Sequence, residues 1–152
     1  MGPNDKHIEE IEAYKENLIG DLTINDALIL VAVCAAKEKA TPDDNHIDDA
    51  KRIAALAQNH PIFLDLADSI ETSINKFMNM IGTTTDLVKA VDTAANVLKP
   101  ELKEIAFNWV AEIIMPDGVL TEQRKNNLDK YALLLNIDSN DAQRILVEIS
   151  NQ

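Results

Sequence analysis

The sequence has little of what sheets, disulfides and membrane spans require. Its single cysteine, Cys34, excludes an intrachain disulfide and is typical of a reducing compartment. Four glycines, five prolines and 4% aromatic residues are too few for the turns of a sheet protein. The longest purely apolar run, residues 27–36, has about half of the ~20 residues that a transmembrane helix needs. We therefore expect this run, with Cys34, to form a buried core helix.

Positive charge is also scarce, because 14 Lys and Arg residues face 26 Asp and Glu residues and leave a net charge of -12. Such a field repels phosphate backbones and anionic membrane surfaces, so we expect neither nucleic-acid binding nor direct membrane insertion. Cations and basic protein surfaces are the natural partners. Residues 1–10 are polar and acidic and lack the pattern of a signal peptide, which predicts a cytoplasmic location.

Helical periodicity extends along nearly the whole chain. It predicts one all-α domain over residues 1–152, built as a bundle of about eight helices. Two of these helices, at about residues 24–39 and 100–115, are apolar on most or all sides, and a helix of that kind must be central. The first expected helix ends at Gly20.

Polar residues mark where several helices should begin. Thr23 and Thr121 are placed to cap the second and seventh helices, and Asp48 is placed to cap the third. Pro100 suits the first turn of the sixth helix, where its missing N–H costs nothing.

A short pattern occurs twice, in residues 44–52 and 117–125. Each copy has an Asp in a turn, an aliphatic residue, a helix-capping Asp or Thr, an acid and two bases. The repeat predicts a pseudo-duplicated bundle with units at about residues 24–60 and 101–150, in which the two apolar helices pack side by side.

Standard catalytic and cofactor motifs are absent from the sequence, including G-x-S-x-G, H-E-x-x-H, the P-loop and C-x-x-C. The three histidines, His7, His46 and His60, are scattered along the chain. Trp109 lies on an apolar helix, where an aromatic side chain usually belongs to the core. We therefore expect a protein that is not an enzyme.

The acidic turns are the best candidates for a functional site. Their residues are Asp117 and Glu122 in the second copy, and Asp44 and Asp49 in the first. Carboxylates beside a turn carbonyl are what a hard cation such as Ca²⁺ or Mg²⁺ prefers, although the spacing is not that of an EF-hand. Alternatively, carboxylates at helix N-termini are explained by capping and by the helix dipole alone. No other cofactor is indicated.

The repeated unit of apolar helix, Asp-bearing turn and capped helix resembles the tellurite-resistance TerB-like family. In that family the apolar helix runs into Ala-Asp-Gly and an acidic helix start. Here residues 114–122 read Ile-Met-Pro-Asp-Gly-Val-Leu-Thr-Glu, and residues 133–138 are similar to the family's closing Leu-Gly-Leu segment. The family's Asp matches Asp117 directly, whereas Glu122, Asp44 and Asp49 are weaker matches. A later acid of the family falls on Lys51 and Arg124 in the two copies.

The resemblance implies a cytoplasmic, bacterial stress-response protein that is linked to tellurite resistance and binds metal or partner proteins. Our first hypothesis is therefore a non-catalytic TerB-like module that binds a metal cation or a partner protein through its acidic turns. The second is a structural adaptor whose acidic surface meets a basic protein partner. The third, an enzyme with an unrecognised carboxylate pair, requires a pocket around those carboxylates. An exposed apolar stripe on the fourth or fifth helix would favour a homodimer.

Overall fold

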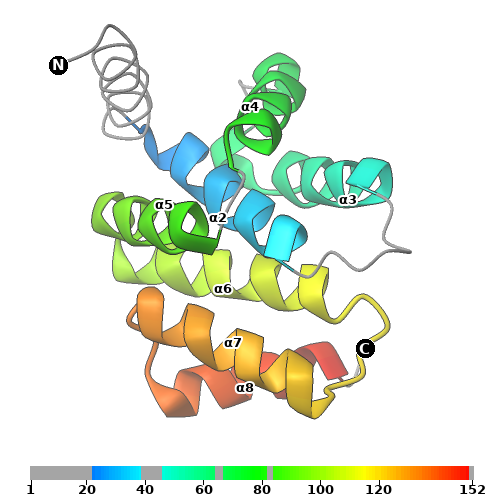
Figure 1. Ribbon diagram of the computed structural model, residues 1–152, viewed down its shortest axis with the longest axis vertical. Coiled ribbons are helices and arrows are strands. Elements are labelled where there is room, and N and C mark those ends of the chain that lie inside the picture. Colours follow the sequence, from blue (N-terminus) through cyan, green and yellow to red (C-terminus); the bar gives the residue numbers. More distant parts are fainter. Residues whose placement is uncertain (1–21, 39–45, 64–66, 82–83, 151–152) are drawn as a thin grey trace, which may run out of the picture.

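The computed structural model describes residues 22–38, 46–63, 67–81 and 84–150. These segments contain helices and no strand, which confirms the all-α class (Figure 1). The first expected helix lies outside the described residues. The described elements, in chain order, are α2 (Ile24–Glu38), α3 (His46–Gln58), the 3-10 turn η1 (Pro61–Phe63), α4 (Ala67–Met80), α5 (Thr84–Val97), α6 (Pro100–Ile114), α7 (Glu122–Leu134) and α8 (Ser139–Ser150).

Helix α2 is central, as its apolar sequence predicts. Residues 27–36 are each at most 1% exposed, because neighbours surround the helix. It packs against α3, α4, α5 and α6, and Figure 1 shows it between the α3–α4 pair and the α5–α6 pair. Cys34 is fully buried within it, so its placement in the core is confirmed.

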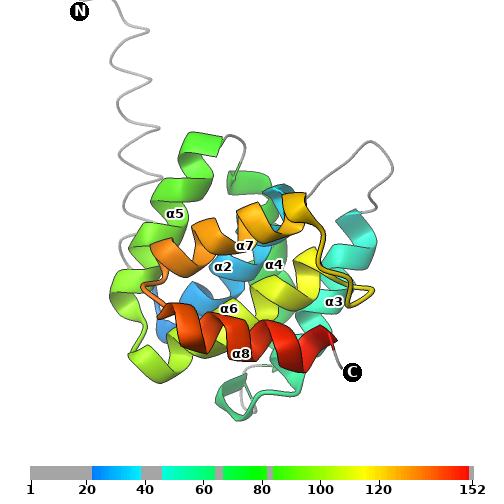
Figure 2. The ribbon, with the colours of Figure 1, turned by 90° about the horizontal axis from the view of Figure 1, so that it is seen from below.

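Helix α6 is the second central element and lies against α2. It also contacts α3, α7 and α8, and Figure 2 shows α7 and α8 covering it from below. Trp109 on α6 is 4% exposed, and its ring centroid lies 6.1 Å from that of Phe63 and 6.2 Å from that of His60. The prediction of a core tryptophan is therefore confirmed.

Helix starts follow the sequence signals, with one exception. The Thr23 hydroxyl accepts a hydrogen bond from the Asp26 amide at 3.2 Å, and the Thr121 hydroxyl accepts one from the Arg124 amide at 3.2 Å. Pro100 lies in the first turn of α6. The third helix begins at His46, so the prediction that Asp48 is its cap was wrong, and Asp48 lies inside the first turn.

A left-handed residue ends α7 and turns the chain back into α8. Asn136 has φ 55°, a conformation that Asn tolerates better than most side chains. Its amide donates to the Leu133 carbonyl at 3.1 Å, while the Ile137 amide donates to the Ala132 carbonyl at 2.8 Å. This pair of bonds is a Schellman motif. It brings α8 back against α6, where Ile145, Leu146 and Ile149 are buried.

None of the described helices has the length and apolar character that a membrane crossing requires. Among the described residues of α4 and α5, Val88 is the one large apolar residue whose side chain is exposed. The described parts of these helices therefore show no exposed apolar stripe of the kind that would favour a homodimer. A homodimer stays a prediction.

Candidate functional site

The Asp117 turn joins α6 to the segment that leads into α7. The Gly118 amide donates to the Met115 carbonyl at 3.0 Å and closes the turn. Gly118 has φ 75°, which glycine adopts without the steric cost that a side chain would bring. The Asp117 Oδ1 atom accepts a hydrogen bond from the Val119 amide at 3.1 Å. The carboxylate therefore stabilises its own turn.

Arg124, in the first turn of α7, fastens this turn to the helix. Its Nη1 atom lies 2.6 Å from Asp117 Oδ1 and 2.7 Å from the Val119 carbonyl oxygen. The pKa of Asp117 is lowered, first by the Val119 amide and then by the Arg124 guanidinium. Asp117 is therefore ionised at neutral pH, and one of its oxygens already accepts two hydrogen bonds.

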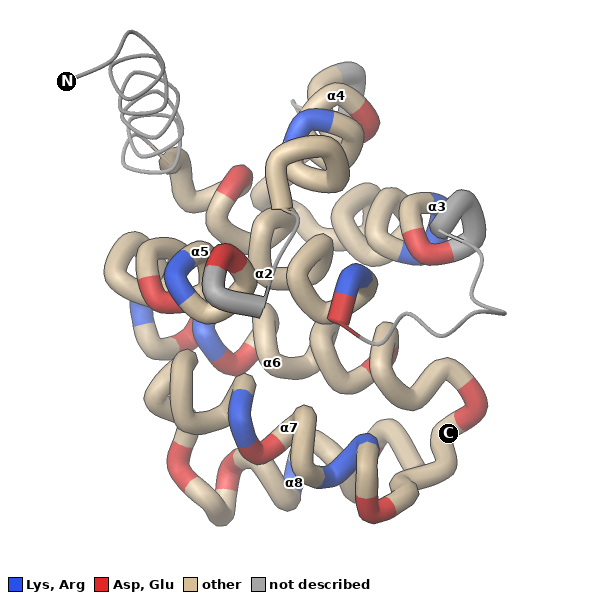
Figure 3. Tube along the Cα trace, viewed as in Figure 1, with Lys and Arg blue, Asp and Glu red and all other residues tan. Residues whose placement is uncertain are grey.

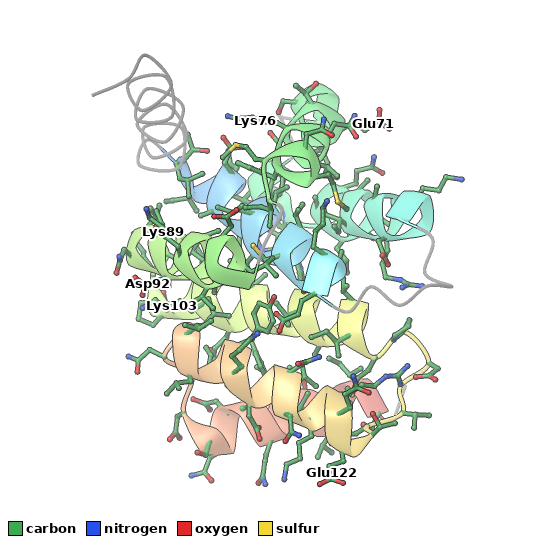
Figure 4. All side chains as sticks on the ribbon, in the orientation of Figure 1. Glu71, Lys76, Lys89, Asp92, Lys103 and Glu122 are labelled. Atoms are coloured by element: carbon green, nitrogen blue, oxygen red, sulfur yellow. The ribbon has the colours of Figure 1, made fainter. Side chains whose placement is uncertain are left out.

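The structure does not gather Asp117, Glu122 and Asp49, the predicted metal ligands that lie in its described part, into one cluster. Glu122 is exposed in the first turn of α7, and Figure 4 shows it at the edge of the molecule. Asp49 lies on α3 and is 2% exposed. Asp44 lies outside the described residues. In the described part of the chain, no three His, Cys, Asp or Glu side chains are placed to hold a metal ion together.

A pocket of about 270 Å³ opens beside the Asp117 turn. Four elements meet there, because Arg52 comes from α3, Glu112 from α6 and Ile149 from α8, and residues 115–118 of the turn complete the wall. Sequence reasoning missed Arg52 and Glu112 as site residues. The one signal for Glu112 was an acid within the mostly apolar second half of α6, residues 105–114.

Charges of both signs meet at this pocket. Asp117 and Glu112 contribute two carboxylates and Arg52 contributes one guanidinium, while the Arg124 guanidinium lies 2.6 Å from Asp117. Burial raises the pKa of Glu112, and the nearby positive charge of Arg52 opposes this shift. The ionised form of Glu112 is therefore incompletely solvated.

A second hollow lies between α3 and α4 and has a volume of about 440 Å³. Ala50, Ala54 and Ile74 give it apolar walls, and Lys51 and Glu71 are among its polar lining residues. Figure 4 shows Glu71 on α4, toward the opposite end of the molecule from Glu122. The hollow between α3 and α4 is therefore separate from the pocket beside the Asp117 turn.

Elsewhere on the described surface, acidic and basic side chains lie near one another and form ion pairs. Figure 3 shows basic and acidic residues interspersed along the described helices. Arg144 on α8 lies 2.9 Å from Glu104, 3.5 Å from Asp141 and 3.9 Å from Glu148. Such exposed pairs contribute little to stability, about 0–1 kcal/mol each.

Comparison of the chain with protein-family models, with curated proteins and with solved structures finds no match. The resemblance to the TerB-like family therefore stays a prediction that rests on the residues quoted above.

Proposed function

We propose that this chain is a non-catalytic, TerB-like binding module that acts by binding a partner protein with a basic surface. The observation that carries the proposal is the ion pair between Arg124 and Asp117. A Ca²⁺ ion needs about six to eight oxygen ligands, but Asp117 Oδ1 already accepts from Val119 and from a guanidinium 2.6 Å away. A metal ion at this turn would have to displace or repel Arg124.

Two features support a protein partner. The net charge of -12 favours approach of a basic surface. Directly after the turn, Val119 and Leu120 are 53% and 41% exposed, so an apolar pair adjoins the charged pocket. Protein interfaces commonly combine such an apolar contact with a polar rim. These features equally support the adaptor hypothesis, which shares the basic partner.

The TerB-like resemblance supplies the cellular role in the proposal. It implies a cytoplasmic bacterial stress-response protein linked to tellurite resistance, and in that setting the module would recruit its partner without catalysing a reaction. The apolar α6, the Asp117-Gly118 turn and the Thr121-capped α7 are the elements on which the resemblance rests.

Thermal unfolding of metal-stripped protein, with and without Ca²⁺, Mg²⁺, Mn²⁺ and Zn²⁺, separates partner binding from metal binding. An ion that binds the folded state raises the unfolding midpoint by mass action. We expect no ion to produce a selective rise that Asp117→Asn abolishes. A rise lost in Asp117→Asn would contradict the proposal, and a rise lost only in Asp44→Asn would place a metal site at the first acidic turn.

A further inference from the structure

We draw no further inference here: the strongest candidate, the partly apolar hollow between α3 and α4 that Ala50, Ala54 and Ile74 line, carries none because nothing in the described part of the structure shows what covers it.

Discussion

Lys130 on α7 donates a hydrogen bond to the carboxylate of Glu38, the last residue of α2. The bond joins the two helices through residues that are 92 positions apart in the sequence. The Glu38 side chain is 14% exposed and that of Lys130 is 33% exposed. The Lys130 ammonium also lies 5.8 Å from the centre of the Tyr131 ring, which is itself buried. This contact ties α7 to the central helix α2.

Replacing Lys130 by Met should lower the free energy of unfolding by about 1–3 kcal/mol, because Glu38 loses a partner in a mostly buried position. Urea unfolding measures the change. Lys125→Met, on the same helix and exposed, is the matched control and should stay within about 0.5 kcal/mol of the wild type. Equal effects of the two substitutions would show that the Glu38 pair adds nothing to stability.

Gly118→Ala should destabilise the protein by about 1 kcal/mol or more, because φ 75° is unfavourable for a side chain. Crowding is not the cause, since a Cβ atom there would lie 3.6 Å from the Ile149 carbonyl oxygen, an ordinary contact. Gly118→Asn should cost less, because Asn tolerates positive φ. Thermal unfolding of both variants checks this order, and a neutral alanine variant would refute the argument from strain.

Asp117→Asn should lose a contribution to stability that depends on pH. The pKa of Asp117 is lowered in the folded state, so its contribution is fully present above the unfolded value of about 3.9 and is lost as pH falls through the folded value. Urea unfolding across this pH range should show wild type and variant converging in acid. Arg124→Gln should show the same convergence. A difference that persists or grows at the lowest pH would contradict this account of the Asp117 turn.

Cys34 should be protected from alkylation in the folded protein. Burial, and then the negative charge of Glu38, raise the pKa of its thiol, and the reactive species is the thiolate. We expect the reaction with iodoacetamide to be on the order of a hundredfold slower in native protein than in protein unfolded by guanidinium. Similar rates in both states would mean that α2 opens readily.

The central helices and most helix starts could be predicted from the sequence because their signals are local. Residues 27–36 are apolar on every side, and Thr23 and Thr121 cap through an amide three residues ahead. The start of α3 was predicted wrongly, because Asp48 is a residue type that favours the N-cap position but lies within a helix that already begins at His46.

The candidate site could be predicted only in part. The sequence singled out Asp117 but left open whether it caps a helix or binds a cation, and the structure shows it holding its own turn and pairing with Arg124. The pocket depends on how α3, α6 and α8 meet, so Arg52 and Glu112 become neighbours only through tertiary packing. No local pattern encodes that juxtaposition.

The central claim is that the chain binds a basic partner protein without a metal ion, and affinity capture from a lysate of the source organism tests it most directly. Capture by the tagged wild-type protein is compared in chelator at low salt and at about 0.5 M salt, where surface electrostatics are screened. The account predicts a captured protein that is retained in chelator and lost at high salt. Capture that requires a divalent ion, or that withstands high salt, would contradict it.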